Sequence, residues 1–228
     1  MARPAATPPR TALVAGATGL VGQALLAQLL DDDRYRKVEV VARRPLTSAL
    51  ARHPRLAVRI GDAAELAGEE PPADDVYIAL GTTIKVAGSE AAFRAVDFDI
   101  VVAIARAARR AGATRLGVIS ALGADATSLV FYNRVKGEME AAVRSLGYAS
   151  VVIARPSLLL GDRAALGQPT RRGEVWAARL LGPMLPLVPA GVRPIEGATV
   201  AAALIAALAD APALRVLSSA EMQRFARR

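Results

Sequence analysis

The chain has 228 residues, of which 53% are hydrophobic, and this is enough for one sizeable α/β domain with a large core. It has no cysteine and a single histidine, His53, which excludes disulfides, thiolate metal sites and histidine-cluster metal sites. The formal net charge is +8, but the arginines are spread along the chain and aromatic residues make up only 4%. We therefore expect no specific nucleic-acid binding. No acidic cluster resembles a carboxylate magnesium site, so we expect no metal.

The first element along the chain is a strand at Thr11–Ala15, which is apolar on both faces. Gly16, Gly19 and Gly22 follow at even spacing, and then a helical pattern of leucines up to Leu30. This order of strand, glycine turn and helix is typical of dinucleotide binding, because the helix N-terminus presents free N–H groups to a pyrophosphate. The stretch is also uncharged over roughly 20 residues, as in a membrane span or a signal peptide. Its glycines, glutamines and threonines favour the nucleotide turn.

Further strands and helices alternate along the rest of the chain. We expect strands at Val38–Ala42, Leu56–Ile60, Val76–Leu80, Leu116–Ser120, Ser150–Ala154 and Leu214–Leu217. We expect helices from Ser89, as N-cap, to Arg110, from Ser128 to Leu146 and from Thr199 to Ala209, with a short one at Glu174–Leu181. Residues 1–10 and 219–228 are predicted to be flexible tails, and Ala164–Arg172 a polar loop. The alternation predicts one α/β domain over residues 1–228, with a doubly wound, mostly parallel sheet and helices on both faces.

Tyr132 and Lys136 lie four residues apart on the helix predicted from Ser128, so both side chains share one face. A free tyrosine has a pKa of about 10, and a nearby cation favours the phenolate, so the pair exchanges a proton more readily. Ser120 ends the preceding strand, where its hydroxyl is expected to polarise a carbonyl group. A tyrosine and a lysine at this spacing are also common on solvated helix faces, so the interpretation depends on the glycine turn and the serine as well.

Together these residues resemble an atypical short-chain dehydrogenase/reductase and, more narrowly, the NAD(P)H-binding oxidoreductases related to Tat-interacting protein 30. The family's Tyr-x-x-x-Lys and upstream serine are present, and the glycine motif is G-x-x-G-x-x-G, as in that family. The resemblance covers nearly the whole chain. It is carried by GATGLVG at 16–22, LGTTIKVAGSEAAFRAVDFD at 80–99, SALGAD at 120–125, FYNRVKGEME at 131–140, ARPSLLLG at 154–161 and GVRPIEGATVA at 191–201.

The resemblance implies a Rossmann-type fold with a small C-terminal substrate-side region, and it implies roles by position. The pyrophosphate is expected at Gly16, Thr18, Gly19, Leu20 and Val21. Asp62 is expected to face the adenine, and Leu80, Gly81 and Thr82 to line the adenosine and ribose. Lys136 is expected to bond the nicotinamide ribose, with Pro156 and Ser157 near the nicotinamide ring. Asp62 is equally explained as a turn former after Gly61, and Ser157 as the cap of a turn after Pro156.

The end of the second strand indicates which cofactor is used. NAD-binding chains place an acid there, about twenty residues past the glycine turn, to bond the ribose 2′-hydroxyl. This chain has Arg43 and Arg44 instead, and Glu39 lies too early in the strand. Because guanidinium groups suit a 2′-phosphate, NADP(H) is favoured over NAD(H), although an arginine-rich chain also places arginines there by chance.

These observations predict an NADP(H)-dependent oxidoreductase that reduces a small-molecule carbonyl substrate, with Ser120, Tyr132 and Lys136 as catalytic residues. The alternative from another class is an NADP(H)-binding redox sensor or regulatory scaffold with little or no turnover. A sugar-nucleotide epimerase is a weaker alternative, because the region after Gly161 is short for a large substrate domain. No second stretch is suited to span a membrane, so we expect no membrane association and a cytoplasmic protein. Neither the substrate's identity nor the oligomeric state follows from the sequence.

Overall fold

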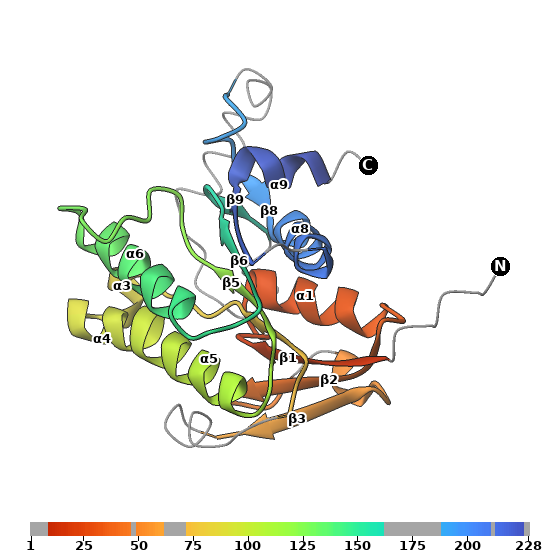
Figure 1. The fold of residues 1–228 in the computed structure, drawn as a ribbon. Helices are drawn as coiled ribbons and strands as arrows, with labels where there is room; N and C mark the ends of the chain where they lie inside the picture. Colours follow the sequence, from red (N-terminus) through yellow and green to blue (C-terminus); the bar gives the residue numbers. More distant parts are fainter. Residues whose placement is uncertain (1–8, 47–48, 62–71, 162–187, 211–212, 226–228) are drawn as a thin grey trace.

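Within the part of the chain that the structure describes, seven parallel strands form a sheet in the order β3-β2-β1-β4-β5-β6-β9 (Figure 1). The computed structural model describes residues 9–46, 49–61, 72–161, 188–210 and 213–225. The strands are β1 (Arg10–Ala15), β2 (Tyr35–Ala42), β3 (Leu56–Ile60), β4 (Asp75–Ile78), β5 (Arg115–Ile119), β6 (Ser150–Arg155) and β9 (Leu214–Ser218). β1 and β4 are neighbours in the sheet, and the strand order reverses its direction between them. In such sheets ligands bind beyond the carboxyl ends of the strands, at the position where the strand order reverses.

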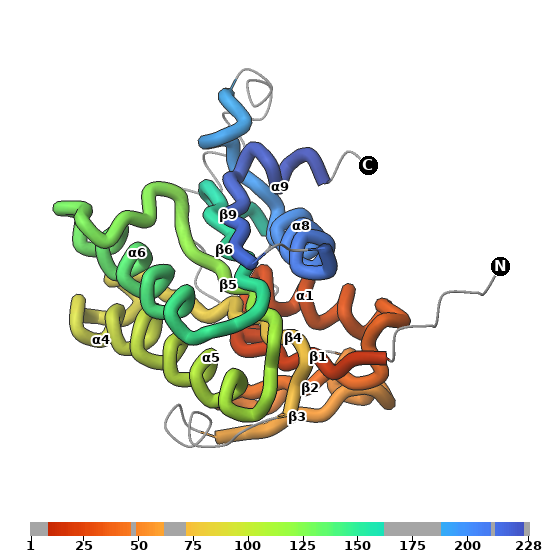
Figure 2. Tube along the Cα trace, in the orientation of Figure 1, coloured from red at the N-terminus to blue at the C-terminus, as the bar shows by residue number. Residues whose placement is uncertain are grey.

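Helices cover both faces of the sheet (Figure 1, Figure 2). One face carries α1 (Leu20–Leu30) and α8 (Gly197–Ala209), which pack side by side, with α9 (Ser219–Phe225) against α8. The other carries α4 (Glu90–Arg94), the π-helix η2 (Ala95–Ile100), α5 (Val101–Arg110) and α6 (Phe131–Arg144). The short elements are η1 (Ala49–Arg52), α3 (Ile84–Ala87), β7 (Leu159–Leu160) and β8 (Ile195–Glu196), of which β7 and β8 pair. The predicted fold class, a Rossmann-type doubly wound sheet, is confirmed.

Alternate residues of each strand enter one of two apolar cores. On β1, Ala12 and Val14 belong to the core beneath α1 and α8, whereas Leu13 and Ala15 belong to the core beneath α5 and α6. All four are fully buried, which explains why the strand shows no polar alternation in the sequence. Leu25 of α1 is also fully buried, and burying one such side chain contributes about 1.5–3 kcal/mol.

The helix predicted from Ser89 to Arg110 begins where expected but is not a single α-helix. The Ser89 hydroxyl accepts a hydrogen bond from the N–H of Ala92 at 3.1 Å, which confirms Ser89 as the N-cap. After α4 the chain passes into η2 before α5 begins. Apolar periodicity does not reveal such an insertion, because it adds only one residue to a turn. The fully buried side chain of Asp97 lies within it.

Three further predictions need correction. The helix predicted from Ser128 begins at Phe131, because the Ser128 hydroxyl accepts a hydrogen bond from Val130 N–H at 3.1 Å and shapes a turn instead. The flexible tail predicted over 219–228 is wrong for Ser219–Phe225, which form α9. Met222 of α9 is fully buried in the α1–α8 core, and Phe225 packs against the same core, so two apolar side chains hold a segment whose sequence is otherwise mostly polar. The tail predicted over 1–10 is wrong for Arg10, which begins β1. Residues 1–8, the loop Ala164–Arg172 and the helix Glu174–Leu181 lie outside the described residues.

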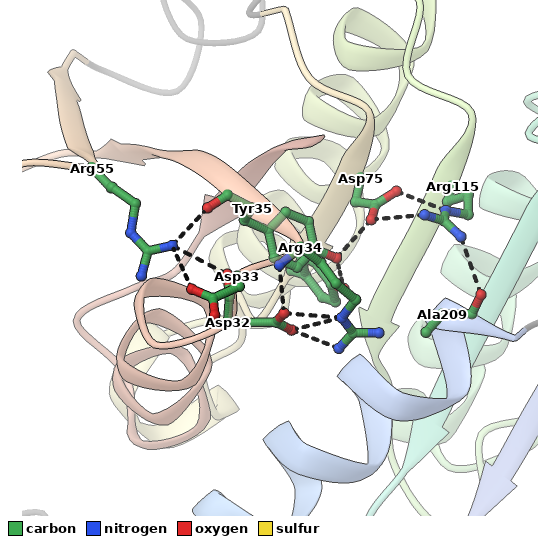
Figure 3. Close-up of polar contacts among 9 residues, drawn as sticks. Asp32, Asp33, Arg34, Tyr35, Arg55, Asp75, Arg115 and Ala209 are labelled. Atoms are coloured by element: carbon green, nitrogen blue, oxygen red, sulfur yellow. Dashed lines mark hydrogen bonds and ion pairs between the residues drawn. The ribbon is translucent and has the colours of Figure 1, made fainter. Parts of the chain in front are cut away.

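A buried polar network closes the amino-terminal edge of the sheet (Figure 3). The Asp75 carboxylate accepts hydrogen bonds from Tyr35 Oη at 2.6 Å and from Arg115 Nε at 2.8 Å, and it pairs with Arg10. Burial raises the pKa of Asp75 to about 6, although the hydrogen bond from Tyr35 and the charge of Arg10 oppose the shift. Arg115 also donates to the carbonyl oxygen of Ala209, the last residue of α8, at 3.2 Å. The network ties four strands to one helix, at the edge opposite the strand carboxyl ends.

Candidate functional site

The glycine turn joins β1 to α1 at the carboxyl edge of the sheet. Gly16 has a φ of +88°, and a Cβ atom there would lie 2.6 Å from the carbonyl oxygen of Ala79, just after β4. A Cβ at Gly22 would lie 1.9 Å from the carbonyl oxygen of Gly16, so α1 packs directly on the turn. Gly19 has looser surroundings, with its nearest neighbour at 3.3 Å. Only glycine meets the demands at the first two positions.

The N-terminus of α1 offers backbone groups rather than side chains. It has no side-chain cap and no acid in its first turn, as a helix end that receives an anion requires. The side chain of Val21 lies in the core. The Leu20 side chain packs closely against two other glycines. A Cβ atom at Gly161 would lie 2.2 Å from Leu20 Cδ1, and a Cβ atom at Gly197 would lie 2.9 Å from Leu20 Cγ. Thr18 is exposed in the turn. Leu20 and Val21 can therefore contact a phosphate only through the main chain.

At the end of β2, Arg43 and Arg44 are exposed, and within the described ranges no hydrogen bond or ion pair occupies them. Glu39 is 1% exposed and forms an ion pair with Arg59 at 3.1 Å, so its carboxylate is buried and already has a partner. Glu39 is therefore not available to bond a ribose 2′-hydroxyl. Asp62, predicted to face the adenine, lies outside the described residues.

At the end of β4, the structure brings Lys136 next to the Gly81–Thr82 turn through a residue that the sequence analysis missed. Asp97 Oδ2 accepts a hydrogen bond from Thr82 N–H at 2.8 Å, and Asp97 Oδ1 lies 2.7 Å from Lys136 Nζ. Leu80 packs against the α5–α6 core. The sequence does carry a signal for Asp97, which stands four residues after Phe93 and four before Val101, both buried, whereas Asp99 falls off this spacing and is exposed.

Tyr132 and Ser120 lie where α6 begins and just past the end of β5. Tyr132 is half-buried, and its ring centroid lies 5.2 Å from that of Phe93. Ser120 is 4% exposed, and its N–H donates to the carbonyl oxygen of Ala154 at 2.7 Å. The Ser120 hydroxyl is buried and has no hydrogen-bond partner among the residues that the structure describes. No bond joins Ser120 to Tyr132 within those residues, so their joint action stays a prediction.

Pro156 and Ser157 follow β6 at the same edge. Pro156 is buried, and its carbonyl oxygen accepts a hydrogen bond from Leu122 N–H at 3.0 Å. The Ser157 hydroxyl donates to the carbonyl oxygen of Arg193 and lies 2.9 Å from the Ser219 hydroxyl. Through these two hydrogen bonds, Ser157 links the start of α9 to the segment before β8. A contact between Ser157 and a nicotinamide ring stays a prediction.

Comparisons with known proteins agree with this geometry. The NAD(P)H-binding family profile matches residues 16–179. Protein HTATIP2 of Rattus norvegicus is 34% identical over 181 residues, which cover 78% of this chain and 72% of that protein. Protein FMP52, mitochondrial, of Eremothecium gossypii is 34% identical over 154 residues, covering 67% of each chain. The solved structure of WbmF from Bordetella bronchiseptica with NAD+ superposes with a TM-score of 0.65 at 18% identity, over 96% of this chain and 78% of that one.

These relatives overturn the expectation of a cytoplasmic protein. Several of the fungal relatives are named mitochondrial, which contradicts that expectation. The expectation rested on finding no second apolar span in the sequence, and such an absence does not distinguish one compartment from another. Among the residues described here, no helix combines the length and the apolar character needed to cross a bilayer.

The glycine turn, the topology of the sheet and the sequence relatives all lead to one assignment. The family profile covers well over half of the chain, and the match to Protein HTATIP2 covers more than two thirds of both proteins. The chain belongs to the NAD(P)H-binding family, as an atypical short-chain dehydrogenase/reductase similar to Tat-interacting protein 30.

Proposed function

We propose that the protein is an NADP(H)-dependent oxidoreductase that reduces a small carbonyl compound. The observation that carries this proposal is the buried Ser120 hydroxyl, which has no hydrogen-bond partner within the described residues. A buried polar group left without a partner costs about 1–3 kcal/mol, so it marks a place where a bound molecule completes the site. A carbonyl oxygen is an acceptor that this hydroxyl can serve.

The residues around the carboxyl edge fit NADP(H). The tight turn at Gly16 and the uncapped start of α1 suit a pyrophosphate, and the Lys136 ammonium lies beside Gly81, where a ribose is expected. The exposed guanidinium groups of Arg43 and Arg44 suit a 2′-phosphate, which NADP(H) has and NAD(H) lacks. When bound, the cofactor supplies a hydride to the carbonyl carbon.

Three side chains have proposed roles in the reaction. Ser120 donates a hydrogen bond to the carbonyl oxygen and holds it in place. Tyr132 gives its phenolic proton to that oxygen as negative charge develops there. Lys136, one helical turn further along α6, contributes a positive charge beside Tyr132 and a donor for ribose hydroxyls.

The test is steady-state NADPH oxidation over a panel of aldehydes and ketones, with wild type beside Tyr132→Phe. We expect the variant to lose about 10²–10⁴-fold in turnover, the usual contribution of a general acid. NADPH binding, followed by calorimetry, should survive because the ring still packs on Phe93. The matched control is Tyr148→Phe, since the Tyr148 hydroxyl donates to the carbonyl oxygen of Ala105 at 2.6 Å in a buried structural contact.

Each outcome has a distinct meaning. Equal turnover in wild type and Tyr132→Phe would show that another group is the acid. Tight NADPH binding without turnover on any carbonyl would favour the redox-sensor alternative. Loss of turnover in Tyr148→Phe as well would mean that the assay reports stability rather than chemistry.

A further inference from the structure

Three large apolar side chains are exposed at the carboxyl edge of the sheet, where Ser120 lies. Leu122 follows β5 and is 45% exposed, Leu158 follows β6 and is 38% exposed, and Val192 precedes β8 and is 54% exposed. The proposed mechanism gives none of them a role. Single exposed apolar side chains are common on protein surfaces, so what matters is whether these three lie together.

Main-chain hydrogen bonds hold the three segments side by side. The Leu122 N–H donates to the carbonyl oxygen of Pro156 at 3.0 Å, which joins the end of β5 to the end of β6. The Ile195 N–H donates to the carbonyl oxygen of Leu158 at 2.9 Å, which joins the end of β6 to the start of β8. Val192 stands three residues before Ile195. The exposed apolar side chains therefore belong to one surface.

The three segments carry no ionisable side chain. Residues 120–124, 156–160 and 188–192 consist of aliphatic residues, glycine, proline and serine. Ser120 belongs to the first of them, and its buried hydroxyl has no hydrogen-bond partner among the described residues. A single hydroxyl donor bordered by apolar side chains suits a carbonyl group attached to an apolar body.

The charged side chains that flank these segments do not favour an anionic ligand. Arg155, at the end of β6, donates two hydrogen bonds to Glu140, at 2.8 and 2.7 Å. Arg193 donates to the carbonyl oxygen of Val188 from Nε at 3.1 Å and from Nη2 at 2.8 Å. Asp125 follows the first segment and is exposed, so its negative charge repels an anion there. The diphosphate of a sugar nucleotide requires cationic partners, whereas an apolar body requires none.

We propose that Leu122, Leu158 and Val192 form an apolar substrate subsite beside Ser120. The substrate class that fits it is an aldehyde or ketone with an alkyl or aryl body, and not a sugar nucleotide. The subsite rests on the proposed function, since Ser120 fixes where the carbonyl group lies. The apolar side chains then determine what that carbonyl group is attached to.

The test measures binding and turnover separately, over a series of chain lengths. Acetamide, butanamide and hexanamide have a carbonyl oxygen that can accept a hydrogen bond from Ser120, but NADPH does not reduce them, so they report binding alone. Calorimetry on the NADPH-loaded protein should give Kd values that fall about two- to fourfold for each added methylene. The kcat/KM for acetaldehyde, butanal and hexanal should rise in the same order. UDP-glucose should not displace hexanamide.

Polar substitutions locate the subsite. Leu122→Asn keeps a side chain of similar size, and we expect the Kd of hexanamide to rise about fivefold while that of acetamide changes less than about twofold. Leu158→Asn should act in the same direction, and it decides the point if Leu122→Asn does not fold. The matched control is Leu214→Asn, because Leu214 is also 45% exposed but begins β9, at the opposite edge of the sheet. It should leave every amide Kd unchanged.

Each result either supports or overturns the subsite. A Kd that does not vary with chain length, or that varies equally in wild type and Leu122→Asn, overturns it. Displacement of hexanamide by UDP-glucose overturns the substrate class. Amide binding that depends on chain length, without turnover of any aldehyde, supports the subsite while the reductase function fails. Equal kcat/KM for acetaldehyde and hexanal supports the reductase function while the subsite fails.

Discussion

Gly22 lies so close to Gly16 that a Cβ atom at Gly22 would approach the Gly16 carbonyl oxygen to 1.9 Å. The first turn of α1 therefore rests on the backbone of the glycine turn without any side chain between them. The helix end that is expected to face the pyrophosphate is held in place by this contact.

The first prediction is that Gly22→Ala damages both stability and cofactor binding. A methyl group forces α1 away from the turn, and overpacking of this kind typically costs about 1–3 kcal/mol, or about 2–12 °C in Tm for a chain of this size. Thermal unfolding and NADPH calorimetry measure the two effects. Gly191→Ala is the control, because a Cβ there has no neighbour within 4 Å. An unchanged Tm in Gly22→Ala would contradict the geometry of the turn.

The second prediction concerns cofactor choice. Arg43 is exposed just after β2, and a charged bidentate contact to a 2′-phosphate contributes roughly 1.5–3 kcal/mol, or one to two decades in affinity. Wild type should bind NADPH more tightly than NADH, and Arg43→Glu should erase or reverse the preference. Calorimetric Kd values for both cofactors measure this.

The control for cofactor choice is Arg36→Glu, which makes the same charge change near the amino end of β2. Arg36 is exposed, and its replacement should leave the ratio of the two Kd values unchanged. Equal affinity of wild type for NADPH and NADH would refute the assignment of the arginines.

The third prediction follows from Asp75, whose pKa burial raises from an ordinary 3.8 to about 6. Between these pH values the folded state binds more protons than the unfolded chain, so the free energy of unfolding falls as pH rises. The contribution is complete below about pH 3.8 and lost above about pH 6. Relative to Asp75→Asn, wild type should therefore lose on the order of 3 kcal/mol between pH 4 and pH 7.

Urea unfolding of wild type and Asp75→Asn at several pH values measures this difference. Asp99→Asn is the control, because Asp99 is exposed and lies in η2, on a different element from Asp75. It should keep the pH dependence of wild type. Parallel curves for wild type and Asp75→Asn would show that Asp75 does not titrate in this range.

Local patterns in the sequence determined most of the fold. The apolar run at Thr11–Ala15 predicted a strand buried on both faces, and the evenly spaced glycines after it predicted the turn into α1. A helix was predicted over Tyr132 and Lys136, and both residues lie in α6. These features are local, because strand burial, glycine conformations and helical spacing are set by residues within a few positions of one another.

Only the tertiary structure decided which polar groups are buried and what they face. Asp97 is fully buried in η2, and its partner Lys136 lies on a different helix, α6. Ser157 contacts Ser219, which lies 62 residues further along the chain and begins a helix that the sequence reads as a tail. Such pairings join residues distant in sequence, and they depend on packing between elements, so no local periodicity encodes them.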